Sequence, residues 1–81
     1  MTVVTLYGKP DCCLCDEARA AVLAVRGRVA FELHEEDVSV DPLLHRRYGE
    51  RIPVVCVDDR EVFEYHVDEA ELECLIGKVA T

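Results

Sequence analysis

Three cysteines stand within four positions near the start of the chain, at Cys12, Cys13 and Cys15. In the first turn of a helix, residues three apart lie on one face, about 5–6 Å from each other. That separation falls within the roughly 4.4–6.8 Å that a disulfide tolerates between Cα atoms. Cys12 and Cys15 meet this condition, whereas a bridge between adjacent Cys12 and Cys13, whose Cα atoms are only about 3.8 Å apart, would be strained. The spacing therefore predicts a Cys12–Cys15 redox pair, with Cys13 as a bystander.

The place of Cys12 at the start of a predicted helix favours its thiolate form. Unpaired N–H groups and the positive end of the helix dipole stabilise negative charge there, and Lys9 stands close by in the sequence. We expect Cys12 to be the exposed attacking thiol. Cys15 lies one turn deeper, in line with Ala18 and Val22, and is expected to be the resolving thiol.

A metal site is the main chemical alternative for the cysteine cluster. Structural zinc needs four ligands, usually supplied as two pairs, and Cys12 and Cys15 make only one pair. The three histidines stand singly at His34, His45 and His66, so no metal ligands are predicted within the chain. A metal site shared between two chains through Cys12 and Cys15 stays an alternative. Cys56 and Cys74 lie in apolar segments and are predicted to be packing thiols, with Cys74 partly buried.

The chain has 81 residues and a formal net charge of −8, which fits one small domain spanning residues 1–81. An acidic surface repels phosphate backbones and anionic headgroups, so we expect no nucleic-acid or membrane partner. No stretch approaches the roughly 20 apolar residues of a membrane span, and no signal-peptide core is present. Five cysteines, an odd number, argue against a secreted disulfide scaffold. We therefore expect a monomeric cytoplasmic protein.

Apolar periodicity and turn residues predict an α/β chain with the order β-α-β-α-β-β-α. Strands are expected at residues 3–7, 31–36, 54–57 and 62–65, and helices at residues 12–25, from Pro42 to a stop at Gly49 with Asp41 as N-cap, and at 69–76. The continuous apolar runs at 3–7 and 54–57 should be central, giving a four-stranded mixed sheet with helices on its faces. In the first helix, Leu14, Ala18 and Val22 are expected to face inward.

The stretch LYGKPDCCLC resembles the glutaredoxin pattern Y-x-K-P-x-C-x-x-C, and RIPVVCVDDREV is similar to the strand that follows the cis-proline of that family. The order of elements over residues 3–77 resembles the thioredoxin fold, and the likeness is greatest to short bacterial glutaredoxin-like proteins with a C-x-L-C site. The resemblance implies a thiol–disulfide oxidoreductase in which Cys12 attacks, Cys15 resolves and Pro53 is the cis-proline opposite them. It also implies that the backbone of Ile52 pairs with an extended substrate.

The resemblance extends to partners. It implies a protein or small-molecule disulfide as substrate and no bound cofactor, only an external reductant, either glutathione or a flavoenzyme of the thioredoxin-reductase type. Lys9 and the helix that opens at Asp68 stand where glutaredoxins hold glutathione. Glutaredoxins carry a Gly-Gly-x-Asp segment there, but this chain has Glu64 and Tyr65, whose side chains crowd the ligand. We therefore expect weak glutathione binding. A non-catalytic partner-binding module of the same fold is the remaining alternative.

Overall fold

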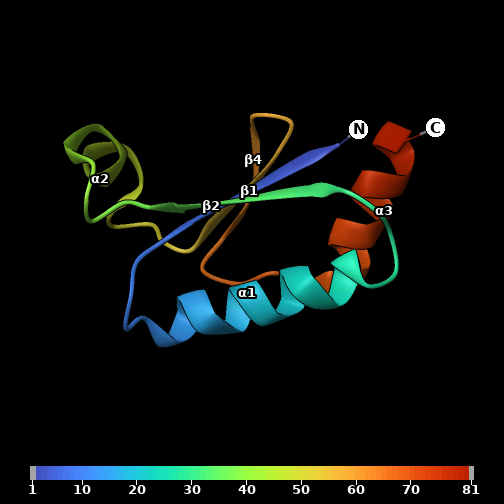
Figure 1. The fold of residues 1–81 in the computed structure, drawn as a ribbon, viewed down its shortest axis with the longest axis horizontal. Helices are drawn as coiled ribbons and strands as arrows, with labels where there is room; N and C mark the ends of the chain where they lie inside the picture. The colour runs from blue at the N-terminus through green and yellow to red at the C-terminus, as the bar shows by residue number, and fades with distance from the viewer. Residues whose placement is uncertain (1, 81) are drawn as a thin grey trace.

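A computed structural model describes residues 2–80, which form strands and helices in the predicted order (Figure 1). The strands are β1 (Val3–Gly8), β2 (Glu32–Asp37), β3 (Val54–Val57) and β4 (Arg60–Glu64). The helices are α1 (Cys13–Arg26), α2 (Pro42–Tyr48) and α3 (Glu69–Ala80). Within residues 2–80, none of the helices combines the length and the apolar character needed to cross a membrane.

The strands form one mixed sheet in the order β2-β1-β3-β4. β1 runs parallel to β2 and antiparallel to β3, and β3 runs antiparallel to β4. All four residues of β3 are buried because the strand has a neighbour on each side and apolar side chains packed over both faces. The predicted fold class and the central places of the two apolar strands are therefore confirmed.

Alternating side chains of the central strands build two apolar clusters, one on each face of the sheet. The larger cluster joins β1 and β3 to α1 and α3: Val4, Leu6, Ala18, Val22, Val25, Phe31, Val55, Val57, Leu72 and Ile76. We call the smaller one the Cys15 cluster: Cys15, Val38, Tyr48, Ile52, Val54 and Cys56. Figure 1 shows α1 lying along one side of the sheet and α2 standing apart from it, near the end where α1 begins. The Cys15 cluster thus links the start of α1 to α2.

The first helix begins one residue after Cys12, which is its N-cap, and ends before Gly27. Its buried stripe has the spacing of one helical face: Cys15, Ala18, Val22 and Val25. The expectation that Leu14 faces inward was wrong, since this side chain is 37% exposed. Cys15 takes the inward place in the first turn, and Leu14 lies on the flank of the stripe.

The shorter helix α2 starts as predicted. The Asp41 carboxylate accepts the Leu43 N–H at 2.9 Å, Pro42 takes the first helical position and Gly49 follows the last. The helix α3 is capped in the same way, because the Asp68 carboxylate accepts the Glu71 N–H at 3.0 Å.

The third helix differs from the prediction in length and in one side chain. It continues past residue 76 to Ala80. Leu72 and Ile76 are buried, but Cys74 is exposed, so its predicted partial burial was wrong. Residues two apart on a helix face opposite sides, and Cys74 stands two positions from both Leu72 and Ile76.

Candidate active site

The loop after β1 delivers Cys12 to the start of α1. Asp11 adopts a left-handed backbone with φ 59°, which aspartate tolerates better than most residues. Cys12 follows in an extended conformation with φ −111° and ψ 115°, and its carbonyl accepts the Asp16 N–H at 3.0 Å. Its sulfur therefore sits at a helix N-terminus, where backbone N–H groups have no partner within the helix.

Cys12 and Cys15 meet within the first turn. The backbone N–H of Cys15 donates to Sγ of Cys12 at 3.3 Å. Cys12 is half-buried and packs against the Cys15 cluster, whereas Cys15 is only 7% exposed. One sulfur of the pair can thus be reached from solvent, and the other is sheltered behind it.

The surroundings shift the pKa values of the two thiols in opposite directions. The side-chain hydrogen bond from Cys15 lowers the pKa of Cys12, and the N–H groups of Cys15 and Leu14 and the charge of Lys9 lower it further, against the effect of burial. Burial raises the pKa of Cys15 to about 11, aided by the hydrogen bond to Cys12. The pair is thus polarised, with the thiolate favoured on Cys12 and the proton retained on Cys15.

The other three cysteines occupy different environments. Cys13 is exposed beside the pair, which agrees with its predicted outward direction. Cys56 is 3% exposed on β3, and burial raises the pKa of its thiol. Among the described residues, no group of three His, Cys, Asp or Glu side chains could hold a metal ion.

These environments predict the order in which the thiols react. We expect iodoacetamide to modify Cys12 faster than Cys56 in the folded protein, because the thiolate is the nucleophile and Cys56 is both buried and protonated. As the pH falls toward neutral, the lowered pKa of Cys12 should keep more of this thiol ionised, so its rate of alkylation should stay high. Quantitative mass spectrometry of the labelled peptides measures both rates, and equal rates for the two thiols would contradict the assignment.

The segment before β3 forms the other side of the site. The Ile52-Pro53 peptide bond is cis, as the resemblance implied. Ile52 is 9% exposed and belongs to the Cys15 cluster, against which Cys12 packs. The N–H of Tyr65 donates to the Pro53 carbonyl at 2.8 Å, and Tyr65 itself has a left-handed backbone with φ 67°. The predicted substrate-binding residue Ile52 thus belongs to the cluster against which Cys12 packs, and Pro53 follows it in the chain.

Arg51, for which the sequence predicted no role, fixes this segment. Its Nη1 contacts Oε1 of Glu61 at 2.6 Å and Oε1 of Glu64 at 2.9 Å. Its Nη2 donates to the Arg47 carbonyl at 3.0 Å. The two carboxylates raise the pKa of Arg51 by hydrogen bonding, which keeps it charged. The only signal in the sequence was its place directly before Ile52.

Two tyrosines, Tyr7 on β1 and Tyr48 on α2, pack together at the Cys15 cluster. The rings of Tyr7 and Tyr48 stack with their centroids 4.2 Å apart. The guanidinium groups of Arg47 and Arg51 lie 5.3 and 5.4 Å from the Tyr48 ring centroid. Burial and the neighbouring Tyr48 raise the pKa of Tyr7 to about 12, so its hydroxyl stays protonated.

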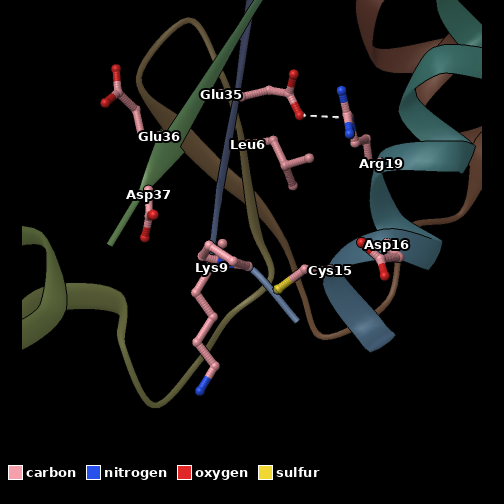
Figure 2. A pocket seen from close by; sticks show the side chains of 10 residues that line it. Leu6, Lys9, Cys15, Asp16, Arg19, Glu35, Glu36 and Asp37 are labelled. Carbon is pink, nitrogen blue, oxygen red and sulfur yellow. Dashed lines mark ion pairs between the residues drawn. The ribbon is translucent and has the colours of Figure 1, made fainter. Parts of the chain in front are cut away.

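A cavity of about 320 Å³ lies between α1 and β2, beside Cys15. Arg19 and Glu35 pair across it, with Nε and Oε1 2.8 Å apart. Figure 2 shows the Cys15 sulfur near the end of β1, with the Lys9 side chain extending away from the Arg19–Glu35 pair. The sheltered thiol therefore borders water-accessible space on the side of β2.

The two remaining predicted residues have different surroundings. Lys9 lies close enough for its charge to stabilise the Cys12 thiolate. Asp68 is exposed and caps its own helix through the Glu71 N–H. The structure thus brings Lys9, Ile52 and the two thiols together and places Asp68 at the start of α3.

Comparison with known sequences assigns the family. Residues 3–77 match the model of the glutaredoxin-like domain, DUF836. The chain belongs to the glutaredoxin-like domain family. This glutaredoxin-like domain is also 29% identical over 80 residues to the uncharacterized protein Rv0508 of Mycobacterium tuberculosis, covering 93% of this chain and 82% of that protein.

Solved structures share the fold. Target protein XcR50 from X. campestris is 31% identical with a TM-score of 0.76, covering 93% of this chain and 96% of that one. Protein Ne2328 from Nitrosomonas europaea is 26% identical with a TM-score of 0.78, covering 91% and 89%. A mutant thioredoxin from Halobacterium salinarum is 23% identical with a TM-score of 0.71, covering 95% and 73%. This glutaredoxin-like domain therefore has the thioredoxin fold.

Proposed function

We propose that this glutaredoxin-like domain is a thiol–disulfide oxidoreductase that uses Cys12 as nucleophile and Cys15 as resolving thiol. The observation that carries the proposal is the polarised pair. The N–H of Cys15 donates to Cys12 Sγ at 3.3 Å, the pKa of Cys12 is lowered and that of Cys15 is raised to about 11. A nucleophile that is ionised and reachable beside a protonated, sheltered partner is what two-step disulfide exchange needs.

The first step forms a mixed disulfide. The Cys12 thiolate attacks one sulfur of the substrate disulfide, a new S–S bond forms to Cys12, and the other substrate sulfur leaves as a thiolate. The helix N-terminus and Lys9 hold the charge on Cys12 before the attack. Ile52, in the cluster against which Cys12 packs, offers backbone groups to an extended substrate.

The second step releases the product. Once Cys12 is in the mixed disulfide, its negative charge no longer raises the pKa of Cys15. Cys15 loses its proton to solvent and its thiolate attacks Cys12 Sγ, which expels the second substrate sulfur as a thiolate. The substrate gains two electrons, and the protein is left with a Cys12–Cys15 disulfide that an external reductant must reduce.

The proposed reductant is a flavoenzyme of the thioredoxin-reductase type, with glutathione a poor substitute, and the proposed setting is the cytoplasm. Glu64 and Tyr65 support this choice, because they occupy the segment where glutaredoxins have two glycines. The Glu64 carboxylate already forms an ion pair with Arg51, with Oε1 and Nη1 2.9 Å apart. The proposed substrates are protein or small-molecule disulfides, and no metal or other cofactor takes part.

Reduction of insulin tests the function directly. We expect catalysis above the background rate with dithiothreitol, and also when NADPH and thioredoxin reductase regenerate the dithiol. Glutathione with glutathione reductase should give slow turnover. A non-catalytic binding module would leave the rate at background with every reductant. A metal site shared between chains would instead show bound metal in elemental analysis of the purified protein.

A further inference from the structure

The end of β1 touches the resolving thiol at a position without a side chain. A Cβ built on Gly8 would lie 3.0 Å from Cys15 Sγ and 3.3 Å from Cys15 Cβ. Carbon atoms in favourable contact stay about 3.5–4.0 Å apart, and sulfur is larger than carbon. The Cys15 sulfur therefore lies closer to residue 8 than a side chain there would allow without a shift of a few tenths of an ångström.

The main chain on both sides of this contact is fixed. Gly8 pairs with Asp37 in the parallel register of β1 and β2, and its carbonyl accepts the Val38 N–H at 2.9 Å. Cys15 is held by the first turn of α1 and by the Cys15 cluster. Because neither backbone can retreat easily, an added methyl group would displace the sulfur rather than the strand.

We propose that Gly8 is a positioning residue for the second step of disulfide exchange, since it admits the Cys15 sulfur to the place from which it attacks Cys12. This inference rests on the proposed function. Gly8 does not touch the substrate disulfide and acts only through Cys15. The cavity beside Cys15, which Gly8 also lines, gives a displaced sulfur room, so we expect a Gly8→Ala chain to fold.

The attack of Cys15 depends strongly on where its sulfur lies. The thiolate must approach Cys12 Sγ in line with the bond that breaks, and misplacing a reacting atom by about 1 Å costs roughly 10²-fold in rate. A displacement of a few tenths of an ångström, as the 3.0 Å distance requires, should slow the step roughly two- to sixfold on the same scale. The first step needs only Cys12 and should change little.

An aromatic disulfide that releases a coloured thiolate separates the two steps. One equivalent of 5,5′-dithiobis(2-nitrobenzoate) is mixed with reduced protein in which Cys13→Ser and Cys74→Ser remove the exposed bystander thiols. Attack by Cys12 releases the first coloured thiolate, and attack by Cys15 releases the second. We expect Gly8→Ala to leave the first release nearly unchanged and to slow the second roughly two- to sixfold.

A matched control and a stability cycle identify the contact. Gly77→Ala makes the same chemical change where, apart from its own helix, none of the atoms that the structure describes lies within 4 Å of the added Cβ, and both releases should stay as in the parent. Gly8→Ala should destabilise the parent chain toward urea, and it should destabilise a Cys15→Ala chain less, because the sulfur is then absent. An equal loss of stability in both chains would show that the added methyl group does not act through the Cys15 sulfur.

The outcomes also separate this inference from the proposed function. A normal first release with an unchanged or faster second release in Gly8→Ala would overturn the role of Gly8 and leave the dithiol mechanism in place. Failure of the parent chain to give two releases would overturn the proposed function itself, and the role of Gly8 with it.

Discussion

Replacing Cys12 with serine should abolish disulfide reduction, while replacing Cys13 should leave most of it. A serine hydroxyl stays protonated at neutral pH and cannot form the mixed disulfide. Cys13 is exposed on the outer side of the first turn and takes no part in the Cys12–Cys15 hydrogen bond. The two variants differ by one position and make the same chemical change, so each is the control for the other.

The measurement is the initial rate of insulin reduction with dithiothreitol, with thermal unfolding of each variant recorded alongside. Cys12→Ser should fall to the uncatalysed rate and unfold near the temperature of the parent. If Cys13→Ser loses as much activity as Cys12→Ser while staying folded, the Cys12–Cys15 pair is the wrong choice.

The fold followed from local signals that act over a few residues. The run Val54–Val57 is apolar at every position, which suits a strand covered on both faces, and β3 is such a strand. Asp41, Pro42 and Gly49 marked the ends of α2 through their individual backbone preferences. Each signal agrees with the sheet order, so the topology could be predicted without knowing any contact.

The errors arose where several residues compete for one buried place. Leu14 is more apolar than Cys15, yet Cys15 is three residues before Ala18 and completes the stripe that packs on the sheet. Cys74 lies between Leu72 and Ile76 in sequence, but the helical period turns it outward. Periodicity fixes the spacing of a face, and the sheet beneath decides which residues belong to it.

The chemistry of the site was only partly predictable. The C-x-x-C spacing and the helix N-terminus predicted the two cysteines that the structure polarises, with the pKa lowered on Cys12 and raised on Cys15. The contact between Gly8 and Cys15 Sγ could not be predicted, because it depends on how closely the end of β1 approaches α1. The same holds for Arg51, whose carboxylate partners come from β4.

Tyr65 is the residue we expect to limit glutathione binding. Glu64 and Tyr65 stand in the segment where glutaredoxins carry two glycines, and Tyr65 has a φ of 67°, a conformation that glycine adopts without strain. A bulky residue held there costs about 1–3 kcal/mol. Its hydroxyl donates to the Glu50 carbonyl at 3.3 Å and its N–H to the Pro53 carbonyl at 2.8 Å, which holds the ring near the segment that contains Pro53.

Replacing Tyr65 with glycine should therefore tighten glutathione binding by at least about tenfold, equivalent to roughly 1.4 kcal/mol. The change removes the ring that crowds the ligand and keeps the N–H that bonds to Pro53. Relief of the left-handed strain and loss of the exposed hydroxyl contact with Glu50, which is worth about 1 kcal/mol at most, act on the stability of the fold and not on the ligand. Amide shifts of the reduced protein titrated with glutathione would measure the affinity of both chains.

Tyr65→Phe is the matched control, because it removes the hydroxyl and keeps the ring and the strained backbone. It should bind glutathione as weakly as the parent chain if the ring is what excludes the ligand. Saturation of the parent at micromolar glutathione, with shifts centred on Lys9, Pro53 and Asp68, would show that Tyr65 does not block the ligand. Equal tightening by phenylalanine and glycine would assign the block to the Tyr65–Glu50 hydrogen bond instead of to the ring.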